Sequence, residues 1–120
     1  MTYSEGQVFS PNAELINTVN DILTEHELTE LKPLYYAIVA DYYQSVSAYD
    51  LALSYYDISL DGAKDQNQRI LVSDNLYAIG ILYRNLGNYS EAIDYFERAI
   101  EFDSQIDINY SEFLATYGIA

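Results

Sequence analysis

Apolar residues recur at helical spacing along most of this chain. In its clearest stretch, two apolar sets follow one another at steps typical of a helix: Leu76, Ile79, Gly80 and Tyr83, and then Ala92, Ile93, Phe96, Ala99 and Ile100. Such a period is typical of amphipathic helices. Gly87 lies between the two sets, and glycine readily adopts the left-handed backbone conformation that ends a helix. The pattern therefore predicts two consecutive helices joined by a short turn.

The same two-helix pattern occurs 40 residues earlier. This shift aligns Tyr36, Tyr43, Tyr49, Ala52, Tyr55, Tyr56 and Leu60 with Leu76, Tyr83, Tyr89, Ala92, Tyr95, Phe96 and Ile100, and four of these pairs are identical. A further shift of 34 residues places Tyr110, Phe113, Leu114 and Tyr117 on Leu76, Ile79, Gly80 and Tyr83. The chain is therefore predicted to hold two whole repeats and the beginning of a third.

A separate helix is predicted ahead of the repeats. Ser10 and Pro11 form a typical helix start, and an apolar stripe follows at Leu15, Ile16, Val19, Ile22 and Leu23. Pro33 is expected in the first turn of the next helix, where its missing N–H costs little. The predicted helices cover residues 11–25, 33–46, 48–63, 66–86 and 89–103, and a sixth begins near residue 107. We expect one domain over residues 1–120: a flexible segment (1–10), a leading helix (11–30), repeat 1 (33–66), repeat 2 (73–106) and the start of a third repeat (107–120).

The second repeat resembles the tetratricopeptide repeat, in which large and small residues stand at fixed spacing. Its pattern positions are filled here by Leu76, Ile79, Gly80, Tyr83, Ala92, Phe96 and Ala99, and the likeness is clearest in residues 73–106. Ser104 stands where the family usually has proline, and Ala40 and Ser59 replace a glycine and an alanine in the first repeat. The resemblance implies an all-α fold: helix-turn-helix repeats stacked as a short right-handed α-solenoid, preceded here by the leading helix. It also implies a close approach of two helices at Gly80.

Charge narrows the classes of partner. The chain has five basic and 19 acidic residues, which gives a net charge of −14. This charge opposes binding to nucleic acid or to an anionic membrane and favours a basic partner. A second interpretation is that the charge only keeps a tyrosine-rich repeat soluble. No apolar run approaches the roughly 18 residues that span a bilayer, so no membrane insertion is expected. Cytoplasm is the default compartment, and an extracytoplasmic one follows if the chain belongs to a sensor protein.

The sequence offers no set of residues for catalysis, and no metal or cofactor is expected. His26 is the only histidine and lies between Glu25 and Glu27, whose side chains leave a helix in different directions. We therefore expect a solvated helix end there. Tyrosines on repeat positions are predicted to pack between helices rather than to form a ligand platform: Tyr36, Tyr43, Tyr49, Tyr56, Tyr83 and Tyr89. Acidic residues of the second helices predict a solvated outer face: Asp50, Asp57, Asp61, Glu91, Asp94, Glu97 and Glu101.

The resemblance also implies where a partner binds. In tetratricopeptide stacks the first helix of each unit lines the concave surface, which here selects Asp41, Gln44, Tyr77, Ile81, Arg84, Asn85 and Ser111. An ordinary hydrated surface is the other interpretation of this stripe. The predicted function is a non-enzymatic scaffold that binds a protein or peptide. The alternative is a sensor or regulatory module of a larger bacterial signalling protein.

The last residues of the chain form a further apolar face. Phe113, Leu114, Tyr117 and Ile119 have no second helix of the third unit to cover them. Stacked repeats bury their faces against their neighbours. We therefore expect these four residues to contact an identical subunit, as in a homodimer, or the remainder of a longer chain.

Overall fold

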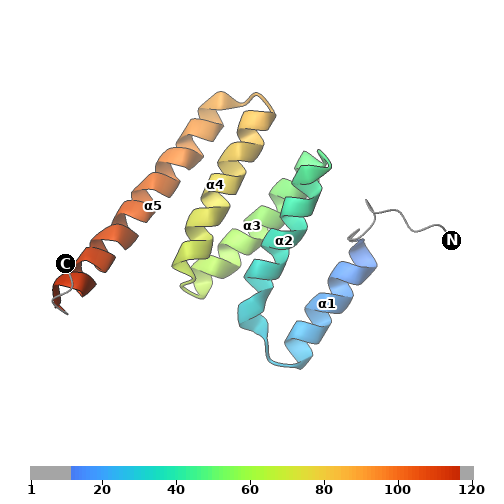
Figure 1. Cartoon of the computed structure of the whole chain (residues 1–120). Coiled ribbons are helices and arrows are strands. Elements are labelled where there is room, and N and C mark those ends of the chain that lie inside the picture. Colours follow the sequence, from blue (N-terminus) through green and yellow to red (C-terminus); the bar gives the residue numbers. More distant parts are fainter. Residues whose placement is uncertain (1–11, 117–120) are drawn as a thin grey trace.

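The computed structural model describes the backbone of residues 12–116 and the side chains of residues 12–104. Its elements are α1 (Ala13–Glu25), the short 3-10 helix η2 (Thr29–Leu31), α2 (Lys32–Ser45), α3 (Tyr49–Asp65), α4 (Arg69–Asn85) and α5 (Tyr89–Thr116). Successive α-helices run in opposite directions and are stacked in chain order from α1 to α5 (Figure 1). The described residues form helices and turns and contain no strand, which confirms the predicted all-α fold of stacked helical repeats.

Four turns of one conformation separate the α-helices. Their middle residues have positive φ angles and follow one another at intervals of 20 residues: Glu27 (57°), Ser47 (63°), Asn67 (56°) and Gly87 (81°). After each of them the next N–H donates to a carbonyl five residues back, as Asn88 does to Tyr83 at 2.9 Å. This bond satisfies a carbonyl that a helix end would otherwise leave without a partner. The left-handed conformation predicted for Gly87 is confirmed, and Ser47 adopts it in the first repeat.

Two helix starts differ from the prediction. α1 begins at Ala13 because Asn12 is its N-cap, and the Asn12 side-chain oxygen accepts the Leu15 N–H at 2.9 Å. The start predicted at Ser10 and Pro11, which lie outside the described residues, is therefore wrong. α4 begins at Arg69 and not at residue 66, because residues 66–68 form one of the left-handed turns. Pro33 lies in the first turn of α2, as predicted.

The predicted sixth helix does not begin as a separate element. α5 continues without a break to Thr116. Residues 103–107 contain neither proline nor glycine, so no residue removes a backbone donor or favours a left-handed turn at this place. The residue that the resemblance aligns with proline is Ser104, which a helix tolerates.

The core lies between two helical hairpins. α2 packs on α3 and α4 packs on α5, while α4 also contacts both α3 and α2. The main buried cluster consists of Ala40, Ala52, Tyr56, Leu60, Ala63, Val72, Leu76, Ile79, Leu82 and Ala99. Alanine fills several of these positions, and a small side chain there lets neighbouring helices approach closely.

A buried polar link joins three of these helices. Ser59 of α3 is 0% exposed and donates its hydroxyl proton to the carbonyl oxygen of Pro33 in α2 at 2.6 Å. Asn75 of α4 is 2% exposed and donates its side-chain amide to the Ser59 hydroxyl oxygen at 2.7 Å. Buried polar groups cost free energy unless they are hydrogen-bonded. Ser59, which departs from the alanine of the repeat pattern, is therefore a specific contact between the two repeats.

Gly80 marks a close approach of α4 and α5. A Cβ atom at this position would lie 2.6 Å from Cε1 of Phe96, far inside van der Waals contact. Phe96 is the large residue that the repeat pattern places opposite the glycine. The close approach that the sequence predicted at Gly80 is confirmed.

Gly80→Leu is expected to lower the unfolding free energy by about 1–3 kcal/mol, because the added side chain forces Phe96 or the α5 backbone to move. Ser54→Leu is the control, since Ser54 is an exposed residue of α3 and exposed substitutions stay within about 0.5 kcal/mol. Urea unfolding followed by circular dichroism measures both. Equal shifts of the two midpoints would contradict the packing of α4 on α5.

Candidate partner-binding groove

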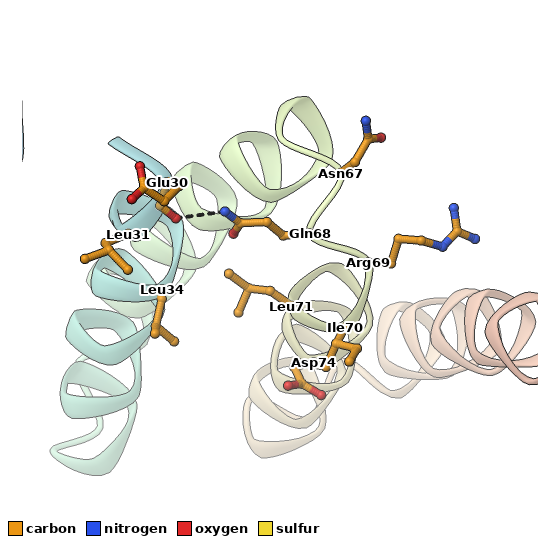
Figure 2. Close-up of a pocket in the computed structure, with 9 residues that line it drawn as sticks. All are labelled: Glu30, Leu31, Leu34, Asn67, Gln68, Arg69, Ile70, Leu71 and Asp74. Atoms are coloured by element: carbon orange, nitrogen blue, oxygen red, sulfur yellow. Dashed lines mark hydrogen bonds between the residues drawn. The ribbon is translucent and has the colours of Figure 1, made fainter. Parts of the chain in front are cut away.

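The largest described groove, of about 710 Å³, lies between α2 and α4, which are the first helices of the two repeats. Its walls are the start of α2 with η2 on one side and the first turns of α4 on the other, and the 66–68 turn closes one end (Figure 2). The lining residues are Glu30, Leu31, Leu34, Asn67, Gln68, Arg69, Ile70, Leu71 and Asp74. The groove thus forms where the two repeats meet.

Exposed apolar side chains line both walls of this groove. Leu31 and Leu34 come from the α2 side and Ile70 and Leu71 from α4, and Leu71 extends towards Leu34 (Figure 2). Leu34 is 49% exposed and Ile70 is 72% exposed. Single exposed apolar residues are ordinary on protein surfaces, but a group of them in one concavity marks an interaction site. These residues could exchange water for an apolar ligand.

Hydrogen bonds fix the end wall of the groove. The Gln68 side-chain amide donates to the backbone carbonyl of Glu30 at 2.8 Å (Figure 2). The Gln66 amide donates to the carbonyl of Thr29 at 3.1 Å. Both bonds tie the turn between α3 and α4 to η2, so the turn and the start of α2 are held together.

The charges at the groove are two carboxylates and one guanidinium. Glu30 and Asp74 line it, and Arg69 points away from Leu31 and Leu34 (Figure 2). The polar groups nearest the apolar side chains are therefore mainly acidic. A ligand with apolar residues between basic ones would match this distribution.

Asp41 and Gln44, which the sequence analysis selected for partner binding, hold a core tyrosine. The Tyr56 hydroxyl of α3 donates to the Asp41 carboxylate and contacts the Gln44 side-chain oxygen at 2.8 Å. A phenol carries one proton, so the two acceptors share it. Burial raises the pKa of Tyr56, and the hydrogen bond to Asp41 raises it further. Both residues thus stabilise the α2–α3 hairpin.

The selected residues of α4 lie on several sides of the helix. The ring centroid of half-buried Tyr77 is 6.3 Å from that of Phe96 in α5. Burial raises the pKa of Tyr77, as does its hydrogen bond to Asp103. Ile81 is half-buried, and Arg84 and Asn85 are exposed in the last turn of α4. None of these residues, nor Asp41 or Gln44, lines the groove described above, and their contact with a partner stays a prediction. The side chain of Ser111 lies outside the described residues.

The groove residues that the sequence analysis missed carry a recognisable signal. Leu31, Leu34 and Ile38 follow one another at helical spacing and form one exposed stripe of η2 and α2. Pro33, Ala37 and Ala40 form a second apolar stripe, which is buried. A helix that is apolar on two faces is either fully buried or has a face that binds something. Two overlapping stripes in residues 31–40 could therefore have indicated the groove.

Tyrosines pack between helices, as most of the sequence expectations had it. Tyr55 of α3 stacks between Tyr36 and Tyr43 of α2, with ring centroids 5.9 and 5.7 Å away. Tyr83 stacks on Tyr95 across the α4–α5 pair at 5.6 Å. The expectation is wrong for Tyr89, which is 65% exposed at the start of α5. Stacked and tilted aromatic pairs add to the stability that burial provides.

The expected solvated positions are exposed. His26 lies in the turn after α1 and is exposed. The seven carboxylates of the predicted acidic face on α3 and α5 are also exposed. Burial and the nearby Asp61 carboxylate raise the pKa of Asp57. Among the described residues, no three acidic, histidine or cysteine side chains are grouped as a metal ion would require.

Contacts predicted for the end of the chain cannot be followed in side chains. Phe113 and Leu114 belong to α5, but their side chains lie outside the described residues. Tyr117 and Ile119 lie outside them altogether. Contact of these residues with a second subunit or with further chain stays a prediction. Within the described part of the chain, no helix has the length and apolar content needed to cross a membrane.

The repeated helical hairpins, the uniform turns and the groove between two first helices define an α-helical repeat protein. The family model of the tetratricopeptide repeat matches residues 34–105, which is more than half of the chain. The chain therefore belongs to the tetratricopeptide repeat family, whose usual role is protein interaction. Comparison with curated proteins and with solved structures gave no match.

Tyr56→Phe is expected to lower the unfolding free energy by about 1–2 kcal/mol near neutral pH, because Asp41 and Gln44 lose their hydroxyl partner. The raised pKa of Tyr56 means that its neutral form contributes fully below the unfolded pKa of about 10 and that this contribution is lost as the pH rises above it. The difference between the wild type and the variant should therefore be constant up to about pH 9 and shrink at higher pH. Urea unfolding at several pH values measures it.

The control is Tyr89→Phe, which removes the hydroxyl of an exposed tyrosine and should stay within about 0.5 kcal/mol of the wild type. A loss at Tyr89 as large as that at Tyr56 would refute the role given to the hydroxyl of Tyr56.

Proposed function

We propose that this protein is a non-enzymatic scaffold that binds an apolar segment of another protein in the groove between α2 and α4, with basic residues flanking that segment. The observation that carries the proposal is the group of exposed apolar side chains on facing walls, above all Leu34 and Ile70. Family membership supports the protein-interaction role in general. The groove adds the chemistry of the partner.

Apolar burial supplies the affinity in this proposal. Fully burying a leucine or isoleucine side chain contributes about 1.5–3 kcal/mol relative to leaving it exposed. Four groove residues of this kind therefore provide several kcal/mol before the costs of association are subtracted. An affinity in the micromolar range, about 1 μM or weaker, is the expected result.

Charge supplies the preference for basic flanks. Glu30 and Asp74 lie at the groove, and the whole chain carries a net charge of −14. Opposite charges steer association and exclude like-charged partners more than they add to affinity. Binding should therefore weaken as salt rises, because exposed charges are screened over about 10 Å at 0.1 M salt. The sensor or regulatory role within a larger bacterial protein stays an alternative prediction that shares the same groove.

The test is a selection of binding peptides from a random-peptide display library, followed by fluorescence polarisation with the selected peptides. We expect apolar residues flanked by lysine or arginine in the selected sequences. Leu34→Asp and Ile70→Asp should each weaken binding by about tenfold or more, because each places a charge in the apolar groove.

Ile58→Asp is the matched control, because Ile58 of α3 is 48% exposed, close to the 49% of Leu34, and does not line the groove. It should bind the selected peptides as the wild type does. If Ile58→Asp weakens binding as much as Leu34→Asp, the groove is not the site. If Arg84→Glu abolishes binding while Leu34→Asp has no effect, the partner binds at the opposite end of α4 and the proposal fails.

A further inference from the structure

A second cleft, of about 440 Å³, gathers most of the basic residues of the chain. Lys64 from the end of α3, Arg69 from the start of α4 and Arg98 from α5 all line it. They are three of the five basic residues in a chain that has 19 acidic ones. Glu101 is the only acidic residue in its lining. The cleft is thus a positive site on a strongly negative protein.

The cations of this cleft are held by aromatic rings and not by carboxylates. The Arg69 guanidinium lies over the ring of Phe102 at 5.0 Å, and the Arg98 guanidinium lies over the ring of Tyr95 at 4.7 Å. In the part of the chain that the structure describes, no ion pair engages Lys64, Arg69 or Arg98. A ring occupies one face of a guanidinium and leaves its N–H groups free to donate in the plane. These donors are therefore available to an external anion.

The remaining lining of the cleft is apolar. Val72 and Leu76 are buried residues of α4, and Phe102 of α5 is half-buried. The cleft also adjoins the first turn of α4, whose N-cap Gln68 gives no side-chain cap hydrogen bond. The N-terminal end of a helix carries partial positive charge that favours anions. A volume of this size falls within the range of small-molecule sites.

We propose that this cleft binds a small organic anion, whose charged group lies at Lys64 and Arg98 and whose apolar part packs on Phe102 and Leu76. The cleft is distinct from the groove between α2 and α4, although Asn67 and Arg69 border both. Occupancy by an anion would also neutralise the only strongly positive region of the described surface. The proposal does not depend on peptide binding in the groove.

The test is a nuclear magnetic resonance titration of the whole protein with phenyl phosphate at constant ionic strength. We expect saturable shifts at the end of α3, the start of α4 and the middle of α5, with half-saturation at about 1–10 mM. Inorganic phosphate, which lacks the apolar part, and benzyl alcohol, which lacks the charge, should both bind more weakly. Lys64→Gln and Arg98→Gln should each weaken phenyl phosphate binding at least about fivefold.

Lys32→Gln is the matched control, since it removes the same charge from α2, away from the cleft. It should leave phenyl phosphate binding unchanged. A loss as large in Lys32→Gln as in Arg98→Gln would overturn the proposal, because binding would then follow net charge alone. Shifts confined to the groove at Leu34 and Ile70, or equal affinity for inorganic phosphate, would overturn it as well.

Discussion

The hydroxyl of Ser59 is the contact on which the arrangement of the two repeats depends. It donates to the Pro33 carbonyl of α2 and accepts from the Asn75 amide of α4, so one buried atom of α3 binds both neighbouring helices. Apolar packing is non-directional and tolerates small shifts of one helix along another. A buried hydrogen-bond pair does not, because a shift would leave polar groups without partners in a low-dielectric core. The groove lies between α2 and α4, so its width follows from this link.

The regular turns set the second constraint. Left-handed residues at positions 27, 47, 67 and 87 give every α-helix the same place in a 20-residue period. Each second helix can therefore bury the same positions against the next unit, as Leu60 of α3 does at 6% exposure. Its counterpart in α5, Ile100, is 56% exposed, because no described helix lies on that side of α5. Stability in such a stack comes from contacts between neighbouring units.

Periodicity predicted the features that backbone geometry dictates. Gly80 and Gly87 were recognisable because a close helix approach and a left-handed turn both favour glycine. The turns at Glu27 and Asn67 were harder to predict, since neither residue is a glycine. The groove was missed because two apolar stripes overlap in α2, and only the packing on α3 decides that Ala37 and Ala40 are buried while Leu34 stays exposed. The roles of Asp41 and Gln44 depend on where the Tyr56 hydroxyl lies, and spacing along one helix does not contain that information.

The most direct test of this account is the coupling free energy between Ser59 and Asn75 in a double-mutant cycle of Ser59→Ala, Asn75→Ala and the double variant. Urea unfolding gives the three changes in unfolding free energy. If the buried link holds the repeats together, the effects are non-additive by about 1–2 kcal/mol, as expected for residues in direct hydrogen-bond contact. Additivity within about 0.3–0.5 kcal/mol would contradict the account, since α3 and α4 would then be held by apolar packing alone.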